Sequence, residues 1–456
     1  MRELHVVVLA AGEGKRMNSR LPKVLQPLAG EPMLLHLLRT VRRLDPACLH
    51  VVVGHAADQV RTALERWPEI RTVTQAERLG TGHAVMQAMG AIPDDARVLV
   101  LPGDMPLVRT DTLQDFSALT APLAILSFMA ADPTGYGRIL RDNNRNVAGI
   151  REQRDATPDE RAIDEVNSGV IAADAGRLSG WLERLGNDNS QGEYYLTDCA
   201  ALAVADGIKV QARVCGDAEE LMGANNMRQL ADLEAVLQRR RRGALLDAGV
   251  RMPDPGSVQI RGRVQAGRDV ELDRGAILEG QVELGDGVVI GAGSIVRDSR
   301  LAAGTRVEPY CVLEGVETTG ACTLGPFARL RPGTVLAAGV RIGNFVETKK
   351  ATFAEGAKAS HLSYVGDATV GARANLGAGT ITCNYDGANK HVTEIGDEAF
   401  IGSNSALVAP VKIGKRATIG AGSVVSGDAQ ADALTVARAR ARTIPGWKRP
   451  VKKEPK

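Results

Sequence analysis

Residues 395–425 read IGDEAF IGSNSA LVAPVK IGKRAT IGAGSV V, and this stretch decides the fold of the C-terminal half. An aliphatic residue returns at every sixth position, at Ile395, Ile401, Leu407, Ile413, Ile419 and Val425. The same spacing occurs earlier, at Leu324, Leu330, Leu336 and Ile342. A period of six fits neither an α-helix nor a strand with alternating sides, but it is typical of short repeats that stack as coils.

Most repeat units carry the aliphatic residue, often a glycine, two variable residues and a small residue, as in Ile413-Gly-Lys-Arg-Ala-Thr418. Three units would make one triangular coil, in which the aliphatic side chains point inward and stack on those of the next coil. Small residues and glycines are expected at the corners, where a bulky Cβ would clash. The repeat therefore predicts a parallel β-helix domain over residues 251–456.

Residues 1–226 follow a different pattern. Short β-branched runs such as His5-Val-Val-Val-Leu9 and Val98-Leu-Val-Leu101 alternate with helical stretches such as residues 33–44. This alternation predicts a Rossmann-like α/β domain with a mostly parallel sheet. Residues 227–250 are predicted to form a helical linker capped by Asn226, and its run Arg239-Arg-Arg-Arg242 is interpreted as a solvated face.

Composition limits the class of function. The 456-residue chain has a formal net charge of +2 and 24% charged residues, so no nucleic-acid partner is expected. Its apolar start is too short to insert into a membrane. Six scattered cysteines without metal-type spacing predict reduced thiols in a cytoplasmic protein, and the basic residues 447–456 predict a solvated tail.

A glycine-rich loop, Leu9-Ala-Ala-Gly-Glu-Gly-Lys-Arg-Met17, follows the first predicted strand. Backbone N–H groups in such a turn can approach phosphate oxygens, and Arg16 and Lys23 could neutralise a triphosphate. Met17 stands where the dinucleotide fingerprint needs its third glycine, and Arg16 where a Walker motif needs Ser or Thr, so neither motif applies. Taken alone, the glycines could also simply make a strand-to-helix turn.

Asp104 follows another predicted buried strand, in Leu101-Pro-Gly-Asp104. It is therefore expected at the carboxyl edge of the sheet, where α/β proteins bind ligands. A Gly-Asp pair by itself is usually a turn, but here phosphate-binding amides and a carboxylate would meet. Together they could hold Mg²⁺ on a nucleoside triphosphate, which makes nucleotidyl transfer the hypothesis for this half.

Polar residues interrupt the repeat of the C-terminal half, at Lys349-Lys350, His361-Leu-Ser-Tyr364, Asn375 and Thr382-Cys-Asn-Tyr-Asp-Gly387. Such interruptions commonly build the functional surface of a solenoid. His361 is either a structural histidine or a general base, because an imidazole can take the proton of an amine that attacks a thioester. Arg331, Lys349 and Lys390 could bind a sugar phosphate.

Further motifs carry a family resemblance: Gly-x-Gly-x-Arg-Met, Pro22-Lys23, Gln75, Leu79-Gly-Thr-Gly-His-Ala84, Gly103-Asp104-Met-Pro106, Gly135-Tyr-Gly-Arg138, Glu152, Asn167-Ser-Gly169 and Asn225-Asn226. They are similar to the motifs of sugar-1-phosphate nucleotidyltransferases. Joined to the hexapeptide repeats, they make the whole chain resemble the bacterial bifunctional enzymes that act as N-acetylglucosamine-1-phosphate uridyltransferase and glucosamine-1-phosphate N-acetyltransferase. The resemblance implies that the β-helix is left-handed.

The resemblance implies a role for each matching residue of the N-terminal half. UTP or the UDP-sugar would be bound by Leu9, Ala10, Ala11, Gly12, Gln75, Gly80, Thr81 and Gly103, and the sugar ring by Gly137, Glu152 and Asn167. Arg16 and Lys23 would act on the phosphates, and Asp104 and Asn225 would bind Mg²⁺. The chain departs from the family at Glu13, where a basic residue is frequent, and at Lys15, where threonine is common.

In the C-terminal half the resemblance implies that His361 is the catalytic base. The acceptor sugar phosphate would contact Arg331, Lys349, Tyr364, Asn375 and Lys390, and acetyl-CoA would contact Ala378, Asn384, Tyr385, Ser403, Ala421 and Arg438. Ala378, Ser403 and Ala421 could equally be present only as small corner residues. Related solenoid acyltransferases close an open side by trimerising, so a homotrimer is expected.

The resemblance thus implies acetyl transfer from acetyl-CoA to glucosamine-1-phosphate, followed by uridylyl transfer from UTP with release of pyrophosphate. The product, UDP-N-acetylglucosamine, would feed peptidoglycan and lipopolysaccharide precursors. One alternative is a nucleotidyltransferase whose β-helix only regulates or trimerises it. Another is a non-catalytic sugar-nucleotide-binding scaffold, although the joint presence of Arg16, Lys23, Asp104 and Asn225 argues against it.

Overall fold

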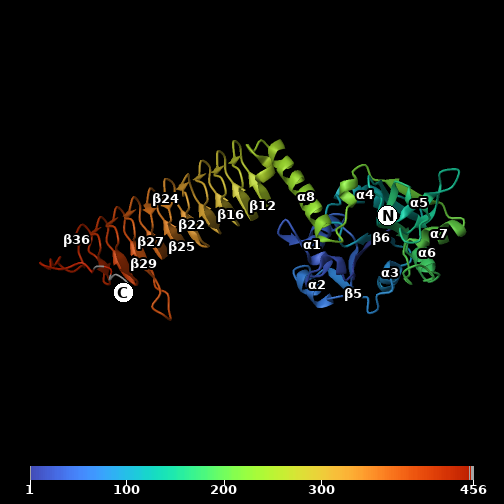
Figure 1. The fold of residues 1–456 in the computed structure, drawn as a ribbon, viewed down its shortest axis with the longest axis horizontal. Helices are drawn as coiled ribbons and strands as arrows, with labels where there is room; N and C mark the ends of the chain where they lie inside the picture. Colours follow the sequence, from blue (N-terminus) through green and yellow to red (C-terminus); the bar gives the residue numbers. More distant parts are fainter. Residues whose placement is uncertain (1, 451, 453–456) are drawn as a thin grey trace. The chain divides into compact units, whose positions relative to one another are not determined.

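The computed structural model describes residues 2–450 and 452, which divide after Gln238 into two compact units. The first unit is a sheet covered by helices, and the second is a stack of parallel strands wound into coils (Figure 1). The predicted fold class, an α/β domain followed by a parallel β-helix, is therefore confirmed.

The first unit is built on one mixed sheet. Its strands are β1 (Leu4–Ala10), β4 (Cys48–Val53), β5 (Ile70–Thr74), β6 (Arg97–Pro102), β7 (Leu123–Met129), β8 (Arg138–Arg141), β9 (Val147–Arg151), β10 (Glu165–Asp174) and β11 (Val210–Val214), and β2 (Pro27–Leu28) pairs with β3 (Glu31–Pro32) outside it. The main order is β11-β7-β10-β6-β1-β4-β5. β1 is parallel to β4 and β6, whereas β10 is antiparallel to β6 and β7.

Helices cover both faces of this sheet. They are η1 (Lys15–Met17), η2 (Lys23–Leu25), α1 (Met33–Arg42), α2 (Ala57–Leu64), α3 (Thr81–Met89), α4 (Thr110–Ser117), α5 (Pro158–Arg161), α6 (Ala175–Leu182), α7 (Asp198–Ala205) and η3 (Ala218–Leu221). Val6 and Val8 of β1 pack with residues of α1, α2 and α4, whereas Val7 packs with residues of α3, α6 and α7. Because side chains alternate between the two faces, β1 is buried on both of them. The loops after β1 and β6 emerge at the same edge of the sheet because the two strands are parallel.

The helix α8 (Met227–Asp247) follows. Asn226 caps it as predicted, since its Oδ1 accepts the N–H of Gln229 at 2.9 Å. The interpretation of the arginine run as a solvated face is wrong for two of its members, because Arg241 donates to the carbonyl of Ile260 at 2.7 Å and Arg242 to that of Val258 at 3.1 Å. These carbonyls belong to the coil that begins the stack.

Among the described residues no helix combines the length and apolar character that a bilayer crossing requires.

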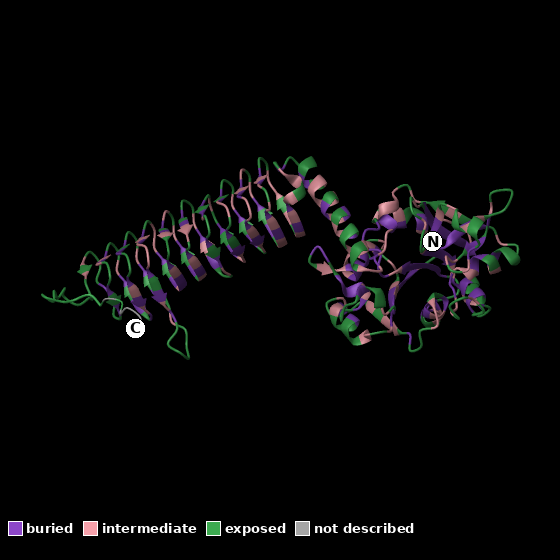
Figure 2. Cartoon of the chain, viewed as in Figure 1, coloured by how far each residue is buried: buried purple, intermediate pink, exposed green. Residues whose placement is uncertain are grey.

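In the second unit each strand pairs with the strand one coil later. Val307 lies opposite Leu324, and Leu324 opposite Ile342, so one coil takes 17 or 18 residues, about three units of six. These aliphatic side chains are buried and stacked, as the period predicts. Figure 2 shows buried residues along the strands and exposed residues in many of the turns between them.

The strands of the second unit are short. After η4 (Pro255–Ser257) they are β12 (Gln259–Ala266), β13 (Glu271–Leu272), β14 (Ile277–Leu284), β15 (Val289–Ile290), β16 (Ile295–Arg297), β17 (Arg300–Leu301), β18 (Arg306–Val307), β19 (Val312–Glu314), β20 (Val316–Thr318), β21 (Thr323–Leu324), β22 (Arg329–Leu330), β23 (Thr334–Leu336), β24 (Arg341–Asn344), β25 (Glu347–Phe353), β26 (Lys358–His361), β27 (Tyr364–Val370), β28 (Asn375–Leu376), β29 (Ile381–Cys383), β30 (Thr393–Ile395), β31 (Phe400–Ile401), β32 (Ala406–Val408), β33 (Val411–Ile413), β34 (Thr418–Ile419), β35 (Val424–Val425) and β36 (Leu434–Thr435). A loop leaves the stack between β29 and β30, where the repeat is interrupted (Figure 1).

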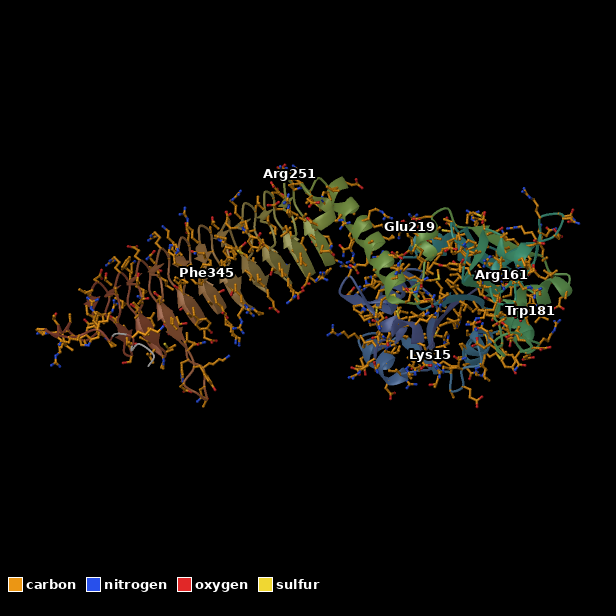
Figure 3. The ribbon with its side chains drawn as sticks, viewed as in Figure 1. Lys15, Arg161, Trp181, Glu219, Arg251 and Phe345 are labelled. Carbon is orange, nitrogen blue, oxygen red and sulfur yellow. The ribbon has the colours of Figure 1, made fainter. Side chains whose placement is uncertain are left out.

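One corner differs from the expected pattern of small residues. Tyr310, Phe327, Phe345 and Leu362 occupy equivalent positions in successive coils, with positive φ, and their side chains are exposed. The rings of Tyr310 and Phe327 stack with centroids 5.4 Å apart, and those of Phe327 and Phe345 with centroids 5.5 Å apart. Figure 3 labels Phe345 in this column. Bulky residues are tolerated here because they point outward and stack on one another.

Candidate functional site

A pocket of about 750 Å³ opens in the first unit. Its lining includes the predicted residues Leu9, Ala11, Gly12, Lys23, Gln75, Gly80, Thr81, Asp104, Glu152 and Asn167. The fold therefore brings together residues from widely separated parts of the chain. Since Leu9 lies near the end of β1 and Asp104 just after β6, the pocket lies at the carboxyl edge of the parallel strands.

Two glycines allow the loops of this pocket to approach one another. Gly14 has a φ of 66°, and a Cβ there would lie 2.6 Å from the Cβ of Lys23. A Cβ on Gly103 would lie 2.7 Å from the carbonyl oxygen of Leu9, to which the Gly103 N–H donates at 2.9 Å. Glycine is required at both positions because any side chain would push Lys23 or Asp104 away from the loop.

Lys23 lies between two oxygen ligands. Its Nζ contacts Asp104 Oδ2 at 2.6 Å and Asn225 Oδ1 at 3.0 Å. The two oxygens thus converge on one positive charge, and Asp104 is only 9% exposed. Carboxylate and amide oxygens are hard donors of the kind that Mg²⁺ prefers, so this pair fits a divalent cation.

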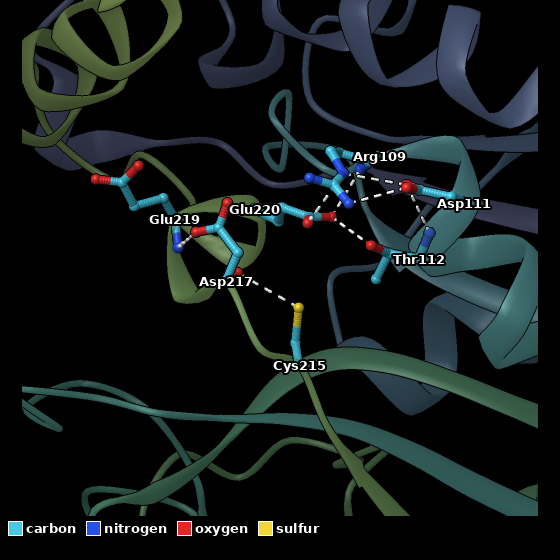
Figure 4. Close-up of polar contacts among 7 residues, drawn as sticks. All are labelled: Arg109, Asp111, Thr112, Cys215, Asp217, Glu219 and Glu220. Carbon is cyan, nitrogen blue, oxygen red and sulfur yellow. Dashed lines mark hydrogen bonds and ion pairs between the residues drawn. The ribbon is translucent and has the colours of Figure 1, made fainter. Parts of the chain in front are cut away.

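A buried carboxylate anchors the segment that leads to Asn225 (Figure 4). Glu220, 2% exposed at the end of η3, accepts the N–H of Arg109 at 3.0 Å and the hydroxyl of Thr112 at 2.7 Å. Further along, a Cβ on Gly223 would lie 3.1 Å from Asp104 Oδ2. The chain between η3 and α8 is therefore held against Asp104 by Glu220 on one side and by the small Gly223 on the other.

Replacing Glu220 with Ala is expected to lower the free energy of unfolding by about 1–3 kcal/mol, because the Arg109 N–H and the Thr112 hydroxyl lose their buried acceptor. Urea denaturation of the full chain, followed by circular dichroism, measures this loss. Asp115→Ala is the matched control: its carboxylate is exposed on α4, and about 0.5 kcal/mol or less is expected. Equal effects of the two substitutions would contradict the anchoring role of Glu220.

Glu152 is a further carboxylate in the lining of the pocket. Thr197 Oγ1 donates to Glu152 Oε1 at 3.0 Å, and burial raises the pKa of this carboxyl group. Gly137 packs on it, because a Cβ there would lie 3.4 Å from the same oxygen. The N–H of Asn167 donates to the carbonyl of Gly137 at 2.8 Å. The three residues predicted to hold the sugar ring are thus neighbours.

The segment of residues 193–197 closes the pocket and was missed from the sequence. Glu193, Leu196 and Thr197 line the pocket, and the Leu196 N–H donates to Thr81 Oγ1 at 3.0 Å. Gly80 packs under this segment with a φ of 106°. Its sequence before α7, Glu193-Tyr-Tyr-Leu-Thr197, has no local pattern of a binding site, so only the tertiary contact identifies it.

The remaining predicted residues of this half lie around the pocket. Ala10 is buried in the core, Arg16 is exposed on η1, and Gly103, Gly137 and Asn225 adjoin residues of the lining. Glu13 forms an ion pair with Arg78, which lowers the pKa of the Glu13 carboxyl group. The acidic departure at Glu13 thus holds a cation, Arg78, in the lining of the pocket.

In the second unit, His361 is oriented by a residue one coil earlier. Its Nδ1 lies 2.8 Å from Asn344 Oδ1, and the two residues are paired between β24 and β26. An amide oxygen only accepts, so Nδ1 carries the proton and Nε2 keeps a free lone pair. Asn344 was missed, although its position one coil before His361 follows from the repeat length.

Three of the predicted acetyl-CoA residues share one edge with His361. The same backbone hydrogen bond recurs from coil to coil. The Leu362 N–H donates to the Asn344 carbonyl at 3.1 Å, the Asn404 N–H donates to the Ala378 carbonyl at 2.7 Å, and the Gly422 N–H donates to the Ser403 carbonyl at 2.8 Å. Arg438 donates to the carbonyl of Ala421 at 2.5 Å. These bonds place Ala378, Ser403 and Ala421 in one column along successive coils, and the register of β26 with β28 puts His361 one coil before Ala378.

Three basic side chains, from β25, from the residue after β22 and from a loop, gather in the second unit. Lys390 and Arg331 lower the pKa of Lys349, with Lys390 as the larger cause, so three cations lie close together. Arg331 also contacts Glu347 at 2.9 Å. The Tyr364 hydroxyl lies over Gly366, which pairs with Lys349. Such a cluster can bind a phosphate.

Lys390 is supplied by the loop between β29 and β30. Tyr385 and Lys390 are bridged across this loop, and Asn384 contacts Asp367. His391 lies 2.7 Å from Asp386. Asn375 begins β28 and precedes Ala378, a member of the column of His361, by three residues.

Known proteins match both units. Residues 6–156 match the MobA-like NTP transferase domain, residues 393–427 the bacterial transferase hexapeptide (six repeats), and residues 276–308 the hexapeptide repeat of succinyl-transferase. Bifunctional protein GlmU of Stenotrophomonas maltophilia (strain K279a) is 55% identical over 99% of both chains, and that of Xanthomonas axonopodis pv. citri (strain 306) is 56% identical over 99% of both.

A third relative, bifunctional protein GlmU of Alkalilimnicola ehrlichii (strain ATCC BAA-1101 / DSM 17681 / MLHE-1), is 55% identical over 98% of this chain and 96% of its own. These matches extend over both units and confirm the resemblance found in the sequence. An NTP transferase and a hexapeptide transferase joined in one polypeptide make the protein an enzyme. The chain belongs to the GlmU family of bifunctional proteins.

Proposed function

We propose that the pocket of the first unit transfers the uridylyl group of UTP to N-acetylglucosamine-1-phosphate and releases pyrophosphate. Ala11, Gly12, Glu13 and Lys15 of the glycine-rich loop line the pocket together with the cations Lys23 and Arg78, which would neutralise a triphosphate. Gly137, Glu152 and Asn167 are the neighbouring residues that would bind the sugar. The arrangement supports a reaction that depends on positioning and charge neutralisation.

We propose that Asp104 and Asn225 hold Mg²⁺, which neutralises charge on the phosphates of both substrates when it is bound. The two oxygens already converge on the ammonium group of Lys23, at 2.6 and 3.0 Å. Lys23 would move from these oxygens to a phosphate when substrate and cation arrive. Arg16, exposed on η1, is free to contact the leaving pyrophosphate.

The second unit, in this proposal, transfers the acetyl group of acetyl-CoA to glucosamine-1-phosphate. His361 Nε2 takes a proton from the amine as the nitrogen attacks the thioester. Arg331, Lys349 and Lys390, with Tyr364 and Asn375, bind the sugar phosphate. Acetyl-CoA lies along the column of Ala378, Ser403 and Ala421, with Asn384, Tyr385 and Arg438 beside it. The single observation that carries this site is the 2.8 Å contact between His361 Nδ1 and Asn344 Oδ1, which in the neutral ring makes Nε2 the acceptor.

The chain is a bifunctional uridyltransferase and acetyltransferase, and the alternative of a purely regulatory β-helix is not favoured, because the GlmU relatives match both units.

We further propose that acetylation precedes uridylylation, and that residues 1–226 and 251–456 are the two functional domains with a linker at 227–250. We also propose that the protein works as a cytoplasmic homotrimer. The six free cysteines support a reducing compartment. The exposed residues along the β-helix corner support self-association.

One assay tests the proposed function as a whole. Purified protein receives glucosamine-1-phosphate, acetyl-CoA, UTP and Mg²⁺, and mass spectrometry follows the products. UDP-N-acetylglucosamine should appear only when all four are present, and N-acetylglucosamine-1-phosphate should appear without UTP. Formation of a UDP-sugar without acetyl-CoA would contradict the proposed order, and sedimentation of the same sample reports the trimer.

Replacing Asn344 with Ala is expected to lower kcat of acetyl transfer by roughly fivefold, since one hydrogen bond contributes about 1 kcal/mol to holding His361. Asn344→Asp should recover most of the rate, because a carboxylate also accepts from Nδ1. If Asn344 only positions His361, Asn344→Ala should change kcat and its pH profile but leave KM for acetyl-CoA unchanged. A loss of folding should instead lower the rate at every pH. An unchanged rate for Asn344→Ala would contradict the orienting role.

A further inference from the structure

Three side chains of metal-binding type meet on the sheet of the first unit, at the end opposite the pocket. They are His5 at the start of β1 and Cys48 and His50 at the start of β4. His5 pairs with Cys48 and Val7 with His50, so the three side chains lie on one face of two adjacent parallel strands. Val7 and Val52 of that face pack in the core under α3 and α6.

The distances suit a tetrahedral ion. One ligand atom from each residue lies within 4.8 Å of the other two, and His5 Nδ1 is 3.4 Å from His50 Nε2. Zinc–nitrogen bonds of about 2.0–2.1 Å at a tetrahedral angle separate two ring nitrogens by about 3.3 Å. The two histidines are therefore already at the spacing that a shared ion requires.

The ring nitrogens are also incompletely paired. His5 is 5% and His50 0% exposed, and within the described part of the chain neither His5 Nε2 nor His50 Nδ1 has a hydrogen-bond partner. Two neutral rings that share one N–H therefore leave a buried donor unpaired in either tautomer. With an ion between the facing nitrogens, His5 Nε2 and His50 Nδ1 would each carry a proton, and the carboxylate of Glu3 lies 3.8 Å from His5 Nε2. A carboxylate behind a metal-bound histidine is a common supporting contact.

The site can be reached from solvent. Cys48 is partly exposed, and Glu3 is 71% exposed at its side chain. An ion could reach the site from solvent at the amino ends of the strands.

We propose that His5, Cys48 and His50 bind one zinc ion, with Glu3 supporting His5, and that this ion ties the amino ends of β1 and β4 together. The site is separate from the pocket, which lies at the carboxyl ends of the parallel strands, and it does not depend on the proposed reactions.

Metal titration of the full chain tests this proposal. The protein is stripped with a chelator under reducing conditions and titrated with Zn²⁺ in competition with a chromophoric chelator, and separately with Co²⁺. We expect one tight equivalent per chain and a thiolate-to-cobalt absorption band. Cys48→Ser should abolish the cobalt band and lower the affinity for Zn²⁺ at least tenfold. His50→Gln should also lower the affinity for Zn²⁺ at least tenfold, and Glu3→Gln should lower it about tenfold.

Two controls separate this site from other ligands of the chain. Cys215→Ser removes a partly exposed thiol of the same unit, and His391→Gln removes the histidine beside Asp386, and both should leave the tight equivalent intact. If His50→Gln unfolds, the cobalt band of Cys48→Ser still decides, because Cys48 is partly exposed. The proposal would be overturned if the wild-type chain bound no tight equivalent of Zn²⁺. It would also be overturned if folded Cys48→Ser bound Zn²⁺ as tightly as the wild type.

Discussion

Replacing Asp104 with Ala is expected to lower kcat/KM of uridylyl transfer by roughly a thousandfold, because a bound metal ion supplies several kcal/mol of charge stabilisation. Asp104 is the charged member of the pair that converges on Lys23 Nζ, at 2.6 Å, whereas Asn225 contributes a neutral oxygen at 3.0 Å. Asn225→Ala should therefore have a smaller effect. Pyrophosphate release from UTP and N-acetylglucosamine-1-phosphate, measured over a range of Mg²⁺ concentrations, gives both numbers.

The same variant must leave the second site untouched. Acetyl transfer to glucosamine-1-phosphate should continue at the wild-type rate in Asp104→Ala, because its residues belong to the other unit. Asp115→Ala, an exposed carboxylate of α4, should change neither activity. If Asp104→Ala kept its uridylyl transfer, or lost both activities while folded, the assignment of the cation to Asp104 would be wrong.

The sequence predicted the features that depend on local repetition. A side chain that returns every six residues can face inward only if the chain turns three times per coil, so the spacing alone places Leu324 and Ile342 inside the stack, one coil apart. Asp104 could likewise be placed at the sheet edge, because strand polarity puts the residue after β6 there.

The features that escaped prediction depend on contacts between distant segments. Thr197 meets Glu152, and Arg78 meets Glu13, through folding of the chain that no local pattern encodes. The arginines 241 and 242 looked solvated because a charged run usually is, yet they satisfy carbonyls of the first coil. Asn344 is an intermediate case, since the repeat length alone would have placed it beside His361.

Replacing His361 with Ala is expected to lower acetyl transfer by roughly 10²–10⁴-fold, the usual contribution of a general base, and to leave uridylyl transfer unchanged. Asn344 fixes the proton on Nδ1, so Nε2 is the atom whose loss matters. Free thiol from acetyl-CoA, measured with a chromogenic disulfide, gives the rate for the wild type, His361→Ala and Asn344→Ala.

The pH dependence of the His361→Ala variant distinguishes a base from a structural histidine. Without the imidazole, only substrate molecules whose amine is already deprotonated can attack, so the rate of the variant should rise about tenfold per pH unit below the amine's own titration. Added imidazole should restore part of the rate by entering the space that the side chain leaves. A variant with a flat pH profile and no rescue would mean that His361 only supports the corner of the coil, and the base would have to be sought among other residues.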